Sequence, residues 1–433
     1  MKKINTAPMS GMQELTPNMQ AEFDRLKAGI SEAFLRHGFQ HIETPVIERT
    51  EILLAKAGGD TEKQIYKVVK TAEAADTADQ ALRFDHTVPL ARYAVEHMND
   101  LTFPFKVTQI ARNFRGERAQ RGRFREFYQC DVDVIGWQSL PVAYDAEVIV
   151  TLAEALKTLP LPEFVIRVSN RKLLSGVIRE LNLEQVAGEV FDIIDHAEKV
   201  SEQKTQERFE ALGIGTENVV KITTFMQIRG KSVEVLEKLR GMGFQNEMFQ
   251  EGVRELGEML EMVEMMMPTL EVMADMLIVR GLDYYTGTVF ETIVPEYREI
   301  GSICSGGRYE NLAENYTDQA LPGVGGSIGL TRLFYILQEF QFVKASEVRA
   351  IDICVVPISK GELEVAGKLA KQLRKDGKAV DLVLTERKLG DKMKYAAKVA
   401  DFAVVVGEEE ARTGAFQMKN LETGETTEVK LVG

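Results

Sequence analysis

The chain has few cysteines, no long hydrophobic run and no low-complexity segment. Its three cysteines, Cys130, Cys304 and Cys354, stand far apart and form no Cys-x-x-Cys pair. This spacing argues against a zinc ribbon or a disulfide framework and fits a reducing environment. No apolar run approaches the roughly 18 residues of a membrane span, and the first residues contain no signal-peptide core. We therefore expect a cytoplasmic protein with no membrane partner.

The composition indicates several hydrophobic cores and an uneven surface charge. The chain has 433 residues, of which 45% are hydrophobic and 27% charged, so we expect about three domains. Its net charge of -13 argues against a general nucleic-acid binder. Residues 112–126 nevertheless contain six arginines against two glutamates, and residues 360–398 contain eleven Lys or Arg against six Asp or Glu. Two such basic islands predict binding of a polyanion at chosen places, although the second fits a solvated, lysine-rich helix face equally well.

The first 170 residues alternate between helix and strand patterns. We expect a helix over 17–38, strands over 105–112 and 126–136 joined by an arginine-rich loop, and a helix over 141–157. Strands that follow one another without a helix between them predict an antiparallel sheet rather than a Rossmann fold.

The middle of the chain first turns helical and then returns to strands. Residues 170–275 have a helical pattern, whereas 276–294 and 300–305 read as strands. The glycine-rich segment 323–329 lacks the Gly-Lys-Ser/Thr of a Walker loop. We interpret its glycines as allowing close packing of a strand and a helix whose first turn carries Arg332.

The last part of the chain has the pattern of a separate α/β domain. Strand and helix signals alternate there, followed by a hairpin, over residues 351–356, 361–376, 379–384, 391–399 and 402–406. We therefore expect three domains. The boundaries are 1–170 with 276–342 for a sheet domain, 171–275 for a helical insertion, and 348–433 for the C-terminal domain.

Residues 280–291, Arg-Gly-Leu-Asp-Tyr-Tyr-Thr-Gly-Thr-Val-Phe-Glu, combine groups suited to a polar ligand. Arginine offers a planar fork for phosphate or carboxylate, and tyrosine an apolar ring with a polar tip. Together with Arg115, Arg123 and Arg332, Arg280 would make a cationic pocket, for which a triphosphate is the obvious anion. Phe127 could stack on a base. Any one of these arginines alone could form an ordinary ion pair.

These segments, in this order, resemble the class II aminoacyl-tRNA synthetases, and among them the histidyl-tRNA synthetases. The resemblance covers nearly the whole chain. Segments 44–48, 114–133 and 329–332 resemble the three class motifs, 280–291 and 305–309 the two histidine-type segments, and 348–433 the anticodon-binding domain.

The resemblance implies a fold, a reaction and partners. The fold is an α+β catalytic domain on an antiparallel sheet with a helical insertion, plus a C-terminal α/β anticodon-binding domain. The reaction is that of a histidine–tRNA ligase: ATP activates histidine to histidyl-adenylate with release of pyrophosphate, and histidine then passes to the 3′ end of tRNA(His). The implied partners are histidine, ATP with Mg²⁺ of unassigned ligands, tRNA(His) and a second copy in a homodimer.

The resemblance also assigns roles to individual residues. Arg280 and Arg115 are expected to be catalytic, and Arg118 and Gln120 to approach the tRNA acceptor end. The expected ATP-binding residues are Arg115, Glu117, Arg123, Phe127 and Arg332. The expected histidine-binding residues are Asp85, Thr87, Gln129, Asp133, Arg280, Tyr284, Tyr285 and Tyr309. No residue is expected to bind a metal.

Two features of this pocket follow from the chemistry of its ligand. The substrate carboxylate is already a nucleophile, so catalysis needs positioning and charge stabilisation rather than a base. An imidazole presents one donor and one acceptor, so the pocket needs a matching pair, and the resemblance assigns this task to Asp133 and Tyr285. Asp133 stands where glutamate is common in the family, and Gly325-Gly326 where a bulkier residue is frequent. Among the chain's five histidines, His86 lies closest to the pocket residues, and we assign it a packing role.

Three other functions fit parts of the pattern. The first is a related synthetase for glycine, proline or threonine, against which the tyrosine pair argues. The second is a non-catalytic paralogue that regulates the ATP phosphoribosyltransferase of histidine biosynthesis, against which the intact arginines and the C-terminal domain argue. The third is an RNA-binding scaffold without catalysis, which the basic islands alone would allow.

Overall fold

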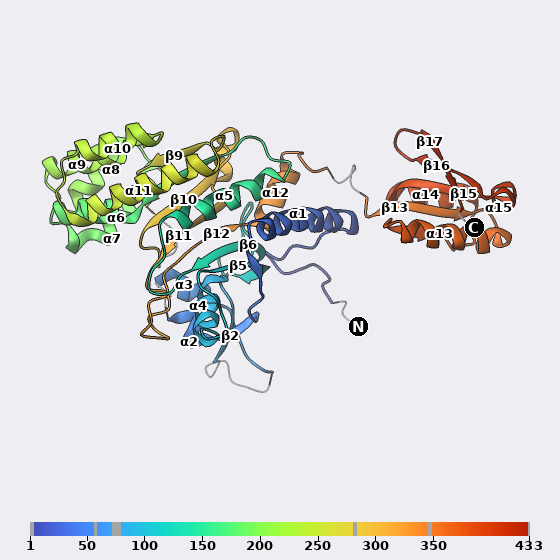
Figure 1. Ribbon diagram of the computed structural model, residues 1–433, viewed down its shortest axis with the longest axis horizontal. Helices are drawn as coiled ribbons and strands as arrows, with labels where there is room; N and C mark the ends of the chain where they lie inside the picture. The colour runs from blue at the N-terminus through green and yellow to red at the C-terminus, as the bar shows by residue number, and fades with distance from the viewer. Residues whose placement is uncertain (1–3, 56–58, 72–78, 280–283, 345–348, 432–433) are drawn as a thin grey trace. The chain divides into compact units, whose positions relative to one another are not determined.

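A computed structural model of the chain describes residues 4–55, 59–71, 79–279, 284–344 and 349–431. They belong to two compact units (Figure 1). The first unit comprises Met1–Gln13 and Lys27–Glu339, and the second comprises Glu14–Leu26 and Phe340–Gly433. Arg280, Gly281, Leu282 and Asp283 lie outside the described residues.

A large sheet forms the framework of the first unit (Figure 1). Among the described residues it has nine strands in the order β1-β5-β6-β12-β11-β10-β7-β9-β8. Their bounds are Gln40–His41, Phe105–Phe114, Glu126–Ile135, Gly323–Ile328, Cys304–Tyr309, Thr288–Ile293, Val165–Asn170, Val272–Asp275 and Arg229–Gly230. Each neighbouring pair from β5 to β7 is antiparallel, whereas β1 pairs with β5 and β9 with β7 in parallel. The predicted antiparallel sheet is confirmed.

One face of this sheet packs against a helix, and the other carries polar side chains. Successive side chains of a strand point to opposite faces, so Gln129 and Asp133 on β6 share a face and Val132 points to the other. On the Val132 face, α5 (Ala143–Lys157) packs against β12. A Cβ atom on Gly326 would lie 2.6 Å from Leu152 of α5, so glycine is needed for this close approach. The opposite face is left for polar side chains.

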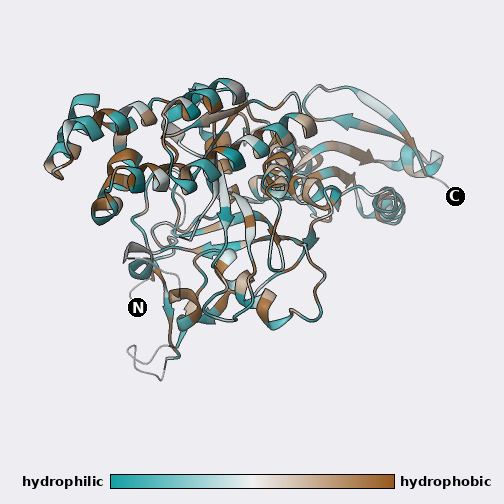
Figure 2. Ribbon diagram, turned by 60° about the vertical axis from the view of Figure 1, so that its left-hand side comes forward, coloured by the Kyte–Doolittle hydropathy of each residue, from teal (hydrophilic) through white to brown (hydrophobic). Residues whose placement is uncertain are grey.

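Helices and a small second sheet complete the first unit. The small sheet has the order β2-β4-β3 (Ile47–Arg49, Gln80–Leu82 and Lys67–Val68). The helices of this unit outside residues 170–275 include α2 (Thr50–Leu54), α3 (Gly59–Gln64), α4 (Thr87–Glu96) and α12 (Leu330–Glu339), and α1 (Pro17–Arg36) contributes residues to both units. Helical ribbons of the chain carry both hydrophobic and hydrophilic residues, as in amphipathic helices (Figure 2).

The helical stretch predicted over 170–275 contains short helices and two strands. Its helices are α6 (Arg171–Glu180), α7 (Ala187–His196), α8 (Glu202–Ala211), α9 (Thr216–Met226), α10 (Ser232–Gly241) and α11 (Glu247–Met266). Strands β8 and β9 join the large sheet.

The strand predicted over 276–294 begins only at Thr288. The apolar run after Asp275 is buried but turns away from the sheet, because the Asp275 carboxylate accepts the Leu277 N–H at 3.0 Å. The strand predicted at 300–305 is likewise displaced, to β11.

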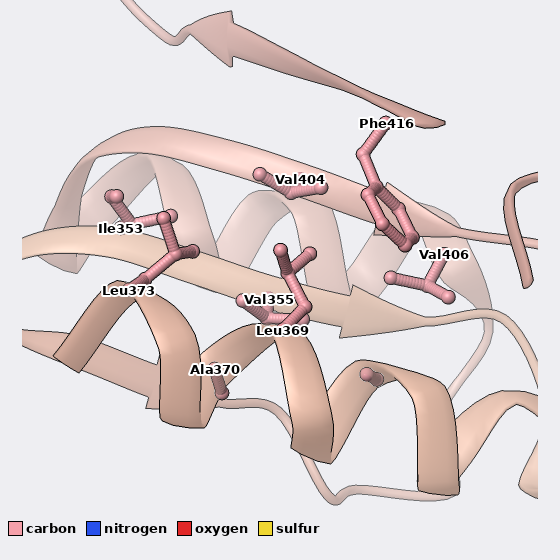
Figure 3. Packing of buried hydrophobic residues seen from close by; sticks show 9 residues of the cluster. Ile353, Val355, Leu369, Ala370, Leu373, Val404, Val406 and Phe416 are labelled. Carbon is pink, nitrogen blue, oxygen red and sulfur yellow. The ribbon is translucent and has the colours of Figure 1, made fainter. Parts of the chain in front are cut away.

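The second unit is built around a five-stranded sheet of order β14-β13-β15-β16-β17. The strands are Val380–Leu382, Ile351–Pro357, Ala400–Val406, Ala415–Asn420 and Thr426–Lys430, and the helices are α13 (Leu363–Lys375), α14 (Leu389–Val399) and α15 (Glu408–Thr413). The first three strands are parallel, and Val355 and Val404 pack with Leu369 and Phe416 in its core (Figure 3). The predicted α/β domain is confirmed, although the pattern missed α15.

Candidate active site

A cleft of about 520 Å³ opens on the polar side of the large sheet. It brings together most of the site residues predicted from the sequence. Those that line it are Asp85, Thr87, Arg115, Glu117, Arg123, Phe127, Gln129, Asp133, Tyr284, Tyr285 and Arg332. They come from the start of α4 and the residues just before it, from the loop between β5 and β6, from β6, from the segment before β10, and from α12.

Arg115 is held between two aromatic rings. Its guanidinium lies 4.4 Å from the ring centroid of Phe84 and 5.1 Å from that of Phe127. Its Nε donates to the Phe84 carbonyl oxygen at 3.3 Å, and its backbone N–H donates to the Arg125 carbonyl oxygen at 2.9 Å. These contacts orient the cation before any ligand binds, which favours recognition of an anion.

Two further arginines meet in the same cleft. Arg332 occupies the first turn of α12, directly after β12, as the glycine-rich segment predicted. Burial and, next, the positive charge of Arg123 lower the pKa of Arg332. Arg123 itself pairs with Glu117 at 3.2 Å. Because the Arg123 charge opposes that of Arg332, an anion bound between them would relieve the repulsion.

Asp133 is a buried carboxylate at the other end of the cleft. Its Oδ1 accepts a hydrogen bond from the Tyr309 hydroxyl at 2.9 Å. Burial and, next, the charge of Asp131 raise the pKa of Asp133 well above its ordinary value. A Cβ atom on Gly325 would lie 2.0 Å from Asp133 Oδ1, so the glycine leaves room for this carboxylate. A residue with a side chain at position 325 would therefore collide with the carboxylate of Asp133.

The tyrosines form an aromatic wall beside Asp133. The ring centroids of Tyr284 and Tyr285 are 5.0 Å apart, and those of Tyr284 and Tyr309 are 5.9 Å apart, both edge to face. Burial raises the pKa of Tyr285 and of Tyr284. Both therefore stay protonated and can donate to a ligand.

Gln129, Asp85 and Thr87 bring polar groups to the rest of the cleft. The side chain of Gln129 accepts from Asn113 Nδ2 at 2.8 Å and donates to Ser327 Oγ at 2.7 Å. Asp85 Oδ1 accepts the Val88 N–H at 3.0 Å, in the first turn of α4. Burial raises the pKa of Asp85, against the lowering effects of that amide and of Arg115.

Three predicted site residues stand apart from the cleft wall, and a fourth falls outside the described residues. Tyr309 lies behind Asp133 and contributes through its hydrogen bond to it. Arg118 and Gln120 are exposed in the loop between β5 and β6. Arg280 lies outside the described residues.

The cleft also contains polar residues that the sequence reasoning missed. Asp131, Ser327, Ser305 and Glu291 line it, and the strand register places them opposite one another across β6, β12, β11 and β10. The signal for Asp131 was present in the sequence. It lies midway between Gln129 and Asp133, and a strand returns to the same face at every second residue.

The chain matches two protein-family models. Residues 11–333 match the model described as histidyl-tRNA synthetase, and residues 352–432 match the anticodon binding domain. The histidine–tRNA ligase of Clostridium tetani is 42% identical over 100% of this chain and 98% of its own length. That of Finegoldia magna is 40% identical over 97% of this chain and 96% of its own.

Solved structures show the same likeness. Histidyl-tRNA synthetase from Nostoc sp. PCC 7120 is similar with a TM-score of 0.89 and 37% identity, over 99% of this chain and 97% of that one. A Bacillus halodurans C protein, described as an ATP phosphoribosyltransferase regulatory subunit/histidyl-tRNA synthetase, has a TM-score of 0.77 at 22% identity, over 94% of this chain and 100% of that one. At that identity the second likeness concerns the fold alone.

Proposed function

This chain belongs to the histidyl-tRNA synthetase family, and we propose that its cleft joins histidine and ATP into histidyl-adenylate with release of pyrophosphate. The histidyl group then passes to the 3′ end of tRNA(His). The observation that carries the proposal is the division of one cleft into two parts. Arg115, Arg123 and Arg332 make one part cationic, whereas Asp133 and Tyr285 furnish the other with buried groups for a small polar ring.

The chain's arginines stabilise the first chemical step. A carboxylate oxygen of histidine attacks the α-phosphorus of ATP, and the bond to the bridging oxygen breaks as pyrophosphate leaves. Arg115 contacts the α-phosphate, and Arg332 covers the adenine and the distal phosphates while Phe127 stacks on the other face of the base. Arg280 bridges the α-phosphate and the substrate carboxylate. Since the carboxylate is already ionised, charge stabilisation and positioning supply the rate enhancement.

Hydrogen bonds select histidine in the other part of the cleft. Asp133 accepts a ring N–H of the imidazole, and the hydroxyl of Tyr285 serves its second nitrogen. Asp85, Thr87 and Gln129 hold the α-ammonium group. A pocket of this kind rejects apolar amino acids, because its buried polar groups would lose their partners.

Mg²⁺ enters this scheme together with the phosphates of ATP. Its ligands in the chain are not assigned. Its chemistry when bound is to neutralise phosphate charge.

The remaining partners are a tRNA and a second copy of the chain. We propose that Arg118 and Gln120, exposed in the loop between β5 and β6, meet the tRNA acceptor end. Residues 348–433 would contact the anticodon, and 171–275 would form a separate insertion. The segment at Thr44 and Pro45, followed by the exposed Val46, would form the homodimer contact.

A cytoplasmic location fits the same chain. Its three cysteines are free and buried, as is usual in a reducing compartment. Among the residues that the structure describes, no helix has the length and apolar character needed to cross a membrane.

The test of this function is pyrophosphate exchange with each of the common amino acids in turn. We expect exchange with histidine alone. Exchange with a different amino acid, and none with histidine, would disprove the specificity. Absence of exchange with every amino acid would favour a regulatory or scaffold protein of the same fold.

Asp133→Asn is expected to weaken histidine binding while stabilising the free protein. The amide still accepts from Tyr309 but loses the charge, so the KM for histidine should rise about 10- to 100-fold. The sign of the stability effect follows from linkage. Because burial raises the pKa of Asp133, the folded protein binds that proton more tightly than the unfolded chain does. Stability therefore falls as the pH rises from the unfolded value through the folded one.

Thermal unfolding at several pH values measures this effect. The Asp133→Asn protein should melt at a higher temperature than the wild type at pH 7.5, and the difference should shrink towards pH 4. Asp100→Asn, at a side chain that is 83% exposed, is the control and should change neither property. An Asp133→Asn protein that is no more stable at pH 7.5 would contradict the role of burial.

A further inference from the structure

Asp131 has a position in the cleft that the functions assigned so far leave unused. It lies on β6 between Gln129 and Asp133, on the same face of the sheet, and lines the cleft. Residues two apart on a strand are separated by about 6.6 Å. Asp131 therefore stands between the residue that holds the amino group and the residue that reads the ring.

His86 orients this carboxylate. Its Nδ1 lies 2.9 Å from Asp131 Oδ2, and the imidazole is fully buried. The backbone of His86 is fixed as well, because its carbonyl oxygen accepts from Leu90 N at 2.9 Å and from Gln109 Nε2 at 3.3 Å. The packing role expected for His86 is thus incomplete, since the ring also holds a carboxylate in place.

The second oxygen of Asp131 lacks a partner. Asp131 Oδ1 is buried and makes no hydrogen bond to any residue that the structure describes. The neighbouring carboxylates differ in this respect, because Asp85 accepts from Val88 and Asp133 from Tyr309. A buried carboxylate oxygen without a donor costs free energy, so a donor brought by a ligand would stabilise the site.

The charge around Asp131 favours a cationic ligand. Asp85, Asp131 and Asp133 are only 5%, 4% and 3% exposed. Burial raises the pKa of Asp85 and of Asp133, and the charge of Asp131 adds to both effects. The guanidinium of Arg83, on which the charge of Asp131 acts, directs Nε to the Arg112 carbonyl oxygen at 2.9 Å and Nη1 to that of Thr44. A positive group between the three carboxyl groups would offset the cost of keeping them charged in a buried site.

We propose that Asp131 is a further substrate-binding residue, which holds the α-ammonium group of the amino acid together with Asp85, and that His86 is its positioning residue. This inference rests on the proposed function, because it takes histidine as the substrate. An ammonium group has three N–H donors. Asp85 and Thr87 approach it from the start of α4, and Asp131 supplies a further acceptor beside Gln129 on β6.

Calorimetric binding of three ligands to Asp131→Asn tests the proposal. Histidine and histidinol carry the ammonium group, whereas 3-(imidazol-4-yl)propanoate has the ring and the carboxylate without it. Asp131→Asn should weaken histidine and histidinol about 10- to 100-fold and change the propanoate less than threefold. Equal weakening of all three ligands, or unchanged histidine binding, would overturn the role of Asp131.

Two variants of His86 test the positioning role. Asparagine can present its amide N–H near the place of imidazole Nδ1, whereas leucine cannot. His86→Leu should raise the KM for histidine about tenfold in the exchange assay and leave the KM for ATP unchanged. His86→Asn should recover most of that loss. A rise in both KM values, or no difference between the two variants, would show that His86 only packs.

Measurements on the wild-type protein distinguish failure of the Asp131 proposal from failure of the proposed function. If it binds histidine and supports exchange while Asp131→Asn keeps full histidine affinity, only the present proposal fails. If the wild type itself neither binds histidine nor supports exchange, the proposed function fails first. Asp100→Asn serves again as the matched surface variant.

Discussion

Replacing Arg115 with alanine is expected to slow histidine-dependent pyrophosphate exchange by about 10²- to 10³-fold, the usual effect of losing one preorganised donor at a developing charge. The fixed position of the Arg115 side chain supports an effect of this size. The guanidinium lies against the rings of Phe84 and Phe127, so its position is restrained before a ligand binds. The loss should fall mainly on kcat, because the interaction is strongest when charge develops on the α-phosphate.

Arg112→Ala is the matched control for this variant. Arg112 lies on β5, three residues before Arg115, and its side chain is 54% exposed and pairs with Glu126 at 3.2 Å. An exposed pair of this kind contributes little to stability, so exchange should change less than threefold. If Arg115→Ala lowered exchange only through a higher KM for ATP, the residue would serve ground-state binding instead of the chemical step.

The sequence predicted the site best at residue types that serve few functions in proteins. Arginines beside a phenylalanine and a tyrosine pair predicted a cleft for a phosphorylated ligand, and the structure brings Arg115, Phe127 and Tyr285 to one cleft. The antiparallel sheet was predictable as well, because strand patterns followed one another without helices. Both predictions depend on local chemistry and order along the chain.

What escaped prediction depends on contacts between distant segments. His86 and Asp131 are 45 residues apart, and nothing in either segment indicates that the imidazole meets that carboxylate. The fit of Gly325 against Asp133 is similar, since it arises from pairing of β12 with β6. The apolar run after Asp275 resembled a strand, but a side-chain to backbone hydrogen bond turned it away. Tertiary contacts decide such cases.

Asp145→Ala is expected to destabilise the catalytic sheet by about 3–5 kcal/mol, because it leaves the charge of Arg308 buried without its counter-ion. The two side chains are only 1% and 4% exposed and lie 2.7 Å apart. Arg308 also donates to the carbonyl oxygens of Leu140 and Pro141, each at 3.0 Å. These two acceptors alone do not neutralise a guanidinium. A double variant, Asp145→Leu with Arg308→Met, should recover part of the loss, since it removes both buried charges.

Amide hydrogen exchange by mass spectrometry measures this loss locally. A change of that size corresponds to amide hydrogen exchange about 10²- to 5 × 10³-fold faster in β11 and β12, while β13 and β15 of the other unit provide an internal reference. The function should follow, because Tyr309 is the next residue after Arg308 and holds Asp133 through its hydroxyl. Asp145→Ala should therefore raise the KM for histidine more than the KM for ATP. Unchanged amide hydrogen exchange in β11 would mean that the ion pair between Asp145 and Arg308 adds nothing to stability beyond the packing around it.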